Sequence, residues 1–321
     1  MAVFGQSLEK IRADAMKGDA VAQQKLGTKY EYADGVGRDY VEAAKWYRKS
    51  ADQGNALGQT ALGLMYADGF GVPQDFKESV KWLRKGAEQG NASAQANLGA
   101  MYARGFGVAQ DYAEAIKWYQ LSVAQGDALG QCNLGKMYVE GLGVKQDFAE
   151  ALRLFHLSAD QGNNFGQQAL GFMYAEGRGV NKDYTEAKNW LLKAAAQGNS
   201  NAEVNLAVLY DKGLGVKQDY TEAAYWYLKA ASLGNARGQN NLGYLYQTGH
   251  GVAQDFTEAV KWYRRAADLG NVSAKGNLGI LLYEGKGVTK DTNEGAKLIR
   301  QVVAETGDDF FRNYLKEHHL L

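Results

Sequence analysis

The stretch Asn91–Gly126, NASAQANLGAMYARGFGVAQDYAEAIKWYQLSVAQG, decides the organisation of the chain, because a similar unit of thirty-six residues recurs along most of it. Its Leu98-Gly99 pair is the clearest marker of the period. The equivalent pairs are Leu26-Gly27, Leu62-Gly63, Leu134-Gly135, Leu170-Gly171, Leu206-Ala207, Leu242-Gly243 and Leu278-Gly279. A fixed period of this length is typical of repeat arrays, in which each unit buries its apolar face against its neighbours. The sequence therefore predicts eight repeats.

Each repeat is predicted to fold as a helix, a glycine loop and a second helix. The first helix begins after a glycine at an Asn or Asp, such as Asn91, whose side chain can cap a free amide. The second begins at an Asp-aromatic-x-Glu segment, as in Asp111 to Glu114, which forms an acidic capping box. A small residue such as Gly99 follows each marker Leu, and it indicates close helix packing, since Gly costs about 1 kcal/mol in a helix interior.

The ends of the array depart from this pattern. We interpret the first loop, Gly35-Val36-Gly37-Arg38-Asp39, as shortened, with the first helix lengthened by two residues. Residues 1–18 are expected to supply an amino-terminal capping helix and residues 307–321 a carboxy-terminal one, on either side of eight repeats at 19–306. A stacked array needs such caps because each end exposes an apolar face. The last segment could equally dock on a partner.

Composition excludes several classes of partner. The chain has 321 residues and a hydrophobic fraction of 45%, so it can bury a core. Its 36 basic and 36 acidic residues cancel, so no net positive charge attracts it to nucleic acid. Cys132 is the only cysteine, which excludes an intramolecular disulfide. No apolar run is long enough to insert into a membrane or to serve as a signal peptide. The sequence as written predicts a cytoplasmic protein, although a periplasmic or secreted one that had lost its signal would look the same.

No motif predicts catalysis, a metal site or a cofactor. The repeated Gly-x-Gly follows no strand and precedes no Lys-Ser/Thr, so it is a turn rather than a phosphate cradle. Ser7 and Lys10 match the Ser-x-x-Lys of penicillin-recognising enzymes, but the companion motifs of those enzymes are absent. The four histidines are scattered, and the recurring Asp/Glu pairs are capping boxes. We therefore predict that the protein is not an enzyme.

The motifs Leu-Gly-x-x-Tyr, Gly-x-Gly-Val, Asp-Tyr-x-Glu-Ala, Lys-Trp-Tyr and Ala-Ala-x-Gln-Gly-Asn occur in order within one repeat unit. In this the chain resembles Sel1-like repeat proteins, relatives of the tetratricopeptide repeats, from about residue 19 to 303. The resemblance implies an all-α, right-handed superhelical α-solenoid of eight 36-residue helix-turn-helix repeats, with the first helices on the concave side. It also implies an adaptor role. A cysteine-rich branch has been linked to penicillin binding and hydrolysis, but that branch staples each repeat with a disulfide.

A stripe on the first helices, opposite the face of the marker Leu, is predicted to line the groove. The residue just before the Leu is an Asn in five repeats, although Asn is a poor helix-interior residue. These residues are Asn97, Asn133, Asn205, Asn241 and Asn277. A row of amides can clamp the backbone of an extended peptide, as in some tetratricopeptide proteins. The alternative is that each Asn belongs to the repeat consensus and bonds to a neighbouring helix.

Aromatic residues on the same stripe are candidate anchors. Phe165 and Phe172 stand seven residues apart where other repeats mostly place smaller or polar groups, and Tyr244 shares the stripe. Local packing in a variant repeat is the alternative. Together these residues predict a non-enzymatic scaffold that binds a protein or peptide partner in the concave groove. The alternatives are a β-lactam-binding or β-lactam-hydrolysing protein and a structural protein that self-associates through its terminal helix; oligomeric state stays open.

Overall fold

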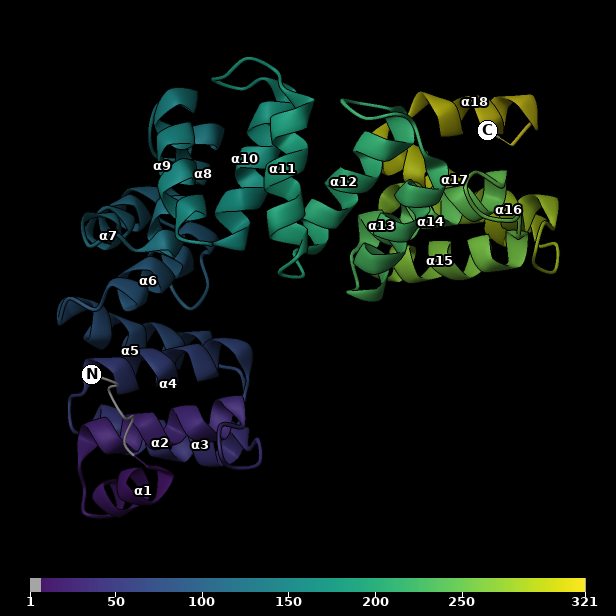
Figure 1. Ribbon diagram of the computed structural model, residues 1–321. Helices are drawn as coiled ribbons and strands as arrows, with labels where there is room; N and C mark the ends of the chain where they lie inside the picture. The colour runs from purple at the N-terminus through teal and green to yellow at the C-terminus, as the bar shows by residue number, and fades with distance from the viewer. Residues whose placement is uncertain (1–6, 321) are drawn as a thin grey trace. The chain divides into compact units, whose positions relative to one another are not determined.

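The computed structural model describes residues 7–320, and every regular element within them is an α-helix (Figure 1). The chain divides into two compact units, Met1–Gly166 and Gln167–Leu321, and the boundary falls inside α10 (Asn164–Glu176). Helices pair in sequence order as first and second helix of successive repeats. The predicted all-α solenoid of eight helix-turn-helix repeats is confirmed.

In the first unit, α1 precedes four helix pairs. The bounds are α1 (Leu8–Met16), α2 (Ala20–Tyr32), α3 (Tyr40–Asp52), α4 (Ala56–Asp68), α5 (Phe76–Glu88), α6 (Ala92–Arg104), α7 (Tyr112–Ala124), α8 (Ala128–Glu140) and α9 (Phe148–Asp160). Within this unit each first helix packs mainly on the second helix that follows it.

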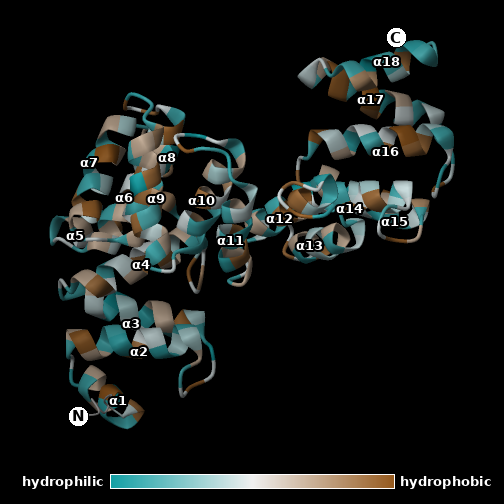
Figure 2. Cartoon of the chain, turned by 45° about the horizontal axis from the view of Figure 1, so that its top comes forward, coloured by the Kyte–Doolittle hydropathy of each residue, from teal (hydrophilic) through white to brown (hydrophobic). Residues whose placement is uncertain are grey.

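The second unit holds the remaining helices and ends with a short terminal one. After α10 these are α11 (Tyr184–Ala195), α12 (Ser200–Lys212), α13 (Tyr220–Ser232), α14 (Ala236–Thr248), α15 (Phe256–Asp268), α16 (Val272–Glu284), α17 (Thr292–Thr306) and α18 (Asp309–Glu317). Apolar and polar residues alternate along the helices of both units in Figure 2. Each helix can therefore bury one side and expose another.

The predicted caps form as the sequence pattern requires. The Asn91 side chain accepts a hydrogen bond from the Ala94 amide at 2.8 Å, and Asp111 accepts one from the Glu114 amide at 3.0 Å. Gly105 ends α6 in the left-handed conformation with φ 71°. The same caps recur along the chain, so helix boundaries are specified locally in each repeat.

The marker leucines lie in the cores, and the tryptophans are either buried or packed against the core clusters. Leu98 is fully buried, and Trp46, Trp82 and Trp190 are each less than 9% exposed. Between repeats, a glutamine contact recurs beside these cores. The Gln95 Nε2 atom donates to the Ala87 carbonyl of the preceding repeat at 3.1 Å. Within the same repeat, the Gln125 Nε2 atom donates to the Gln95 Oε1 atom at 2.8 Å, so Gln95 contacts both the preceding repeat and the second helix of its own repeat.

The interpretation of the first loop was wrong. Helix α2 has thirteen residues, as α4 and α6 do, and it ends at Tyr32. Ala33 then adopts the left-handed conformation with φ 59°, at the position where Gly69 and Gly105 end the next two first helices. The loop is therefore not shortened. The end of this helix was misplaced because the other repeats have glycine at this position, whereas this repeat has alanine.

The two ends of the chain are covered by short helices. Ile11 and Ala15 of α1 belong to the same buried cluster as Leu26 and Trp46. Phe311 and Leu315 of α18 belong to a cluster with Ile280 and with residues of α17. Of the segments predicted as caps, residues 1–6 and 321 lie outside the described part of the chain. Across residues 7–320, none of the helices combines the length and the apolar character that a membrane span needs.

Candidate functional site

The predicted stripe lies on the solvent side of the first helices. Phe165 and Tyr244 are about half exposed, at 48% and 50%. The five asparagines and Phe172 are partly exposed, so none of them belongs to the dry interior. The residues are carried by α6 (Asn97), α8 (Asn133), α10 (Phe165 and Phe172), α12 (Asn205), α14 (Asn241 and Tyr244) and α16 (Asn277).

In the second unit the structure brings Phe172 and Asn205 together in one hollow, which we call the Asn205 hollow. Its volume is about 120 Å³. Val208 of α12 and Arg237 of α14 also line it, and Glu176 of α10 stands at the same wall. Three successive first helices therefore contribute to this hollow. Its complete lining is Gly171, Phe172, Ala175, Glu176, Tyr184, Leu191, Asn205, Val208, Leu209, Leu214 and Arg237.

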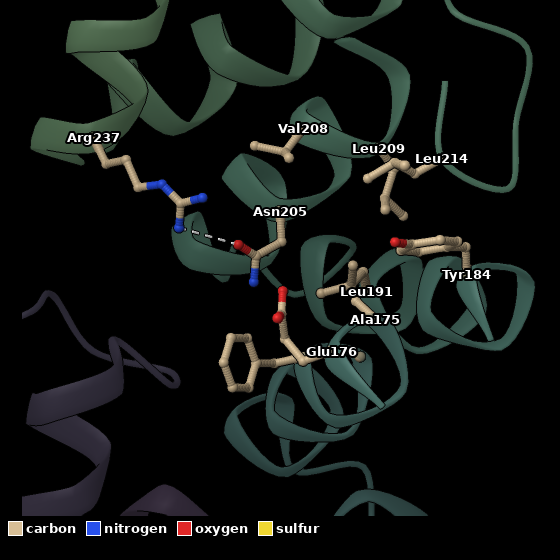
Figure 3. A pocket seen from close by; sticks show the side chains of 11 residues that line it. Ala175, Glu176, Tyr184, Leu191, Asn205, Val208, Leu209, Leu214 and Arg237 are labelled. Carbon is tan, nitrogen blue, oxygen red and sulfur yellow. Dashed lines mark hydrogen bonds between the residues drawn. The ribbon is translucent and has the colours of Figure 1, made fainter. Parts of the chain in front are cut away.

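The Asn205 amide lies between two opposite charges (Figure 3). Its Oδ1 atom accepts a hydrogen bond from the Arg237 guanidinium at 3.3 Å. Figure 3 shows the Glu176 carboxylate on the other side of the amide. Beside these polar groups, the guanidinium of Arg178 lies 5.0 Å from the centre of the Phe172 ring. The hollow thus combines a donor, an acceptor and an aromatic ring within one small space.

Other amides of the row are partly engaged inside the protein. The Asn97 Nδ2 atom donates to the Ser93 carbonyl at 2.8 Å. Asn240 connects two members of the row, because its amide donates to Asn241 and accepts from Asn277, each at 3.2 Å. Only the Asn277 bond reaches a neighbouring helix, as the consensus alternative supposes, whereas the Asn97 and Asn241 bonds stay within their own helices. They leave the peptide-clamp alternative untested, since an amide has donor and acceptor capacity for more than one bond.

The first unit holds a second hollow, which we call the Asp68 hollow. Asp68 and Leu64 of α4 line both of its parts. One part adjoins Asn97 of α6, whereas the other adjoins the exposed side chains of Tyr32 and Leu57. This hollow, like the Asn205 hollow, is formed mainly by first helices.

Two aromatic residues at the Asp68 hollow escaped the sequence analysis. Phe70 and Phe106 follow the first glycine of their loops, and they stack on Tyr40 and Phe76 at centroid distances of 4.9 and 4.8 Å. Both phenylalanines stay partly exposed at 46% and 39%. The spacing of thirty residues between the stacked rings recurs in two neighbouring repeats, and this spacing was the signal that could have revealed them.

The remaining aromatic candidates are placed differently. Phe165 lies near the start of α10, and the Lys136 ammonium of α8 lies 5.4 Å from its ring centre. Tyr244 is exposed on α14. On α16 the stripe is partly closed, because Ile280 is only 8% exposed in the cluster that includes Phe311 of α18.

The groups that suggested chemistry have structural roles. The Ser7 hydroxyl accepts a hydrogen bond from the Lys10 amide at 3.2 Å, so the Ser-x-x-Lys segment is the cap of α1. Cys132 is fully buried, and burial raises the pKa of its thiol, which keeps the thiol protonated. Among residues 7–320, no group of three His, Cys, Asp or Glu side chains is arranged to hold a metal ion.

The helix pairs, their caps and their shared cores define the class of protein, an α-helical repeat solenoid. The pattern of the Sel1 repeat family matches eight consecutive segments, at residues 20–55, 56–91, 92–127, 128–163, 165–199, 200–235, 236–271 and 272–301. The chain belongs to the Sel1 repeat family. Proteins of this family are commonly protein-interaction scaffolds and are generally not catalytic.

Solved structures support the same assignment. The chain is 36% identical to a protective antigen present in uropathogenic Escherichia coli strains that displays an SLR fold. That comparison covers 97% of this chain and 67% of the antigen, with a TM-score of 0.66. A Sel1 repeat protein from Oxalobacter formigenes is 37% identical over 85% of this chain and 79% of its own, with a TM-score of 0.62. No curated protein matches the chain.

Proposed function

We propose that this chain is a non-enzymatic scaffold that binds a peptide or protein partner in the groove lined by its first helices. The Asn205 hollow carries the proposal. A peptide group offers one donor and one acceptor, and Glu176 and Arg237 offer the complementary pair on either side of the Asn205 amide. The Phe172 ring beside them provides an apolar contact for a side chain of the same peptide.

The other predicted residues extend this surface on their own helices. Asn97 lines the Asp68 hollow, and Asn133 lies on the next first helix of the same unit. Asn241, Tyr244 and Asn277 continue the stripe beyond Asn205. Each hollow is lined by both an acidic and a basic side chain, so neither is uniformly positive or negative. A polypeptide therefore fits the groove better than nucleic acid, whose charge is uniformly negative.

A capture experiment with the intact chain tests the proposal. The immobilised protein is compared with a Phe172→Ala, Asn205→Ala, Asn241→Ala variant for the proteins and peptides retained from a cell extract. We expect the variant to lose the retained partner while its thermal midpoint stays within a few degrees of the unchanged chain, since all three side chains are partly exposed.

A variant on the second helices provides the control. Asn189 on α11 and Leu121 on α7 are an exposed amide and an exposed apolar residue outside the groove. Asn189→Ala with Leu121→Ala should retain the partner in full. If the groove variant retains its partner as well as this control does, the assignment of the groove is wrong.

A further inference from the structure

The part of the Asp68 hollow that adjoins Tyr32 differs in charge from the Asn205 hollow. Its charged lining residues are Glu31 of α2 and Asp68 of α4, and no basic side chain in the described part of the chain lines it. The basic lining residue of the Asp68 hollow, Arg104, belongs to the other part. We call the part beside Tyr32 the acidic pocket. Its volume is about 460 Å³, so it is large enough to admit a long side chain.

Asp68 is available to a ligand in this pocket. Its side chain is exposed, and among the described residues it forms neither a hydrogen bond nor an ion pair. Two basic side chains of α2 and α6 are engaged elsewhere. Lys29 pairs with Asp34 at 2.5 Å, and the guanidinium of Arg104 lies 6.0 Å from the centre of the Phe106 ring. The charge of Asp68 is therefore not balanced by an ion pair with any described side chain.

A negative charge at Glu31 is not required by the packing of the repeat. Its carboxylate accepts a hydrogen bond from the Tyr47 hydroxyl. In the seventh repeat the equivalent Tyr263 donates the same bond to the neutral Gln247 at 2.7 Å. Three further repeats have alanine at the position of Glu31, namely Ala67, Ala103 and Ala175. An amide would satisfy Tyr47 equally, so the charge of Glu31 is available for another role.

Aromatic and apolar surface adjoins the two carboxylates. Tyr32 and Leu57 line the pocket and are 65% and 53% exposed. Phe70 lines it as well, and the stack on Tyr40 holds its ring in place. The charge of Glu31 is the main cause that raises the pKa of Tyr32, so the carboxylate lies close to the hydroxyl of that ring. A cation in the pocket would be attracted both by the ring faces and by the carboxylates.

These features fit a long, positively charged side chain. Its methylene stem can cover the exposed apolar surface of Leu57, while its charged end reaches Asp68 and Glu31. A guanidinium fits better than an ammonium, because its plane stacks on an aromatic face and its five donors can bond to more than one carboxylate. A metal ion fits less well, since no group of three His, Cys, Asp or Glu side chains is arranged for one within residues 7–320.

We propose that the acidic pocket binds an arginine side chain of the partner polypeptide, through charge-assisted hydrogen bonds to Asp68 and Glu31 and a stacking contact with the exposed Tyr32 ring. This inference rests on the proposed function, because it takes a polypeptide as the occupant of the groove, and it adds that this polypeptide carries an arginine where it meets the first unit. The acidic pocket lies in the first unit and the Asn205 hollow in the second, so each can be altered without changing the other.

The test uses the intact chain and a small probe, N-acetyl-arginine amide. The amide resonances of the protein are followed by NMR as the probe is added, and the concentration dependence of the shifts gives the affinity. We expect the resonances of pocket residues such as Thr28, Leu64 and Asp68 to move. N-acetyl-citrulline amide has nearly the same shape but no charge. It should bind at least about tenfold more weakly, because it cannot form charge-assisted bonds with the carboxylates.

Variants that remove one charge and keep the side-chain shape locate the site. Asp68→Asn should weaken binding of the arginine probe at least about tenfold and leave the citrulline probe unaffected. Glu31→Gln should also weaken it, and this variant keeps an acceptor for Tyr47, as Gln247 does for its own tyrosine. The matched control is Glu140→Gln, because Glu140 is exposed at the same repeat position as Asp68 but lies on α8, outside the acidic pocket. The control should bind the arginine probe like the unchanged chain.

The proposal is overturned if the arginine probe moves no resonance of the acidic pocket, if the citrulline probe binds equally well, or if Asp68→Asn and Glu140→Gln bind the arginine probe alike. None of these results depends on the capture of a partner. When the groove variant of the second unit loses its partner but the arginine probe does not bind, only this inference fails. When the arginine probe binds but the groove variant keeps its partner, only the assignment of the groove fails.

Discussion

Gly99 of α6 lies so close to the Tyr119 ring of α7 that a Cβ atom on the glycine would fall 2.7 Å from a ring carbon. The Tyr119 side chain is 2% exposed and has little room to move. The same contact recurs in other repeats, for example between Gly27 and Tyr47. Glycine follows the marker Leu in seven of the eight repeats, and Ala207 takes its place in the other. In the repeats that have it, this glycine sets the distance between the two helices.

Replacing Gly99 with alanine should destabilise the fold. The alanine gains about 1 kcal/mol of helix propensity, but overpacking a rigid core typically costs about 1 to 3 kcal/mol. We expect a net loss of about 1 kcal/mol, measured as a lower urea midpoint. Gly37→Ala is the control, since Gly37 has no positive φ and a Cβ there meets no atom within 4 Å. Equal midpoints for the two variants would contradict the packing argument.

The repeat period and its caps allowed most of the fold to be predicted from sequence. Asn91, Leu98, Gly99 and Asp111 each have a local physical role that the sequence displays directly. The site was less accessible to prediction because it depends on contacts between repeats. The hydrogen bond from Arg237 to Asn205 joins residues thirty-two positions apart, and no local pattern indicates it.

Ala33→Gly should stabilise the first repeat. Ala33 is the only non-glycine residue in the described helical repeats that ends a first helix in the left-handed conformation, with φ 59°. An alanine side chain in that conformation costs about 1 kcal/mol, and glycine removes this cost. Part of the gain is lost because glycine has more conformational freedom to lose when the chain folds. We expect a gain of about 0.5 kcal/mol in thermal denaturation. The reverse change, Gly105→Ala after α6, should lower stability; a neutral outcome for both would contradict this account.

Glu203 should make stability depend on pH. It occupies the position of Gln95, is 1% exposed, and has one carboxylate oxygen without a hydrogen-bond partner among residues 7–320. Burial raises the pKa of Glu203, and Lys229 at 3.8 Å only partly opposes this effect. A carboxyl group whose pKa is raised by folding stabilises the folded chain when the pH is below the pKa that the group has in the unfolded chain, about 4.3. That contribution is lost as pH rises through the folded pKa.

Glu203→Gln should therefore raise stability at neutral pH by about 1 to 3 kcal/mol, because it removes a buried charge with an unsatisfied oxygen. The gain should shrink as pH falls towards about 4, where the glutamic acid is protonated. Urea midpoints measured at several pH values check this. The opposite change, Gln95→Glu, is the matched control and should be harmful at neutral pH but milder in acid. A pH-independent effect of Glu203→Gln would refute the electrostatic explanation.

Substituting Phe310 and Phe311 separately tests whether the terminal helix α18 stabilises the end of the array. The two rings are adjacent in α18, but Phe311 is 4% exposed and Phe310 is 63% exposed. A Cβ atom on Gly276 of α16 would fall 2.3 Å from the Phe311 ring, so this ring lies directly on α16. Phe311→Ala should cost about 3 kcal/mol, because it empties a buried site, whereas Phe310→Ala should change stability by less than about 0.5 kcal/mol. Hydrogen exchange of α16 and α17 amides should accelerate only in the Phe311 variant. If both variants leave that exchange unchanged, α18 does not stabilise the end of the array.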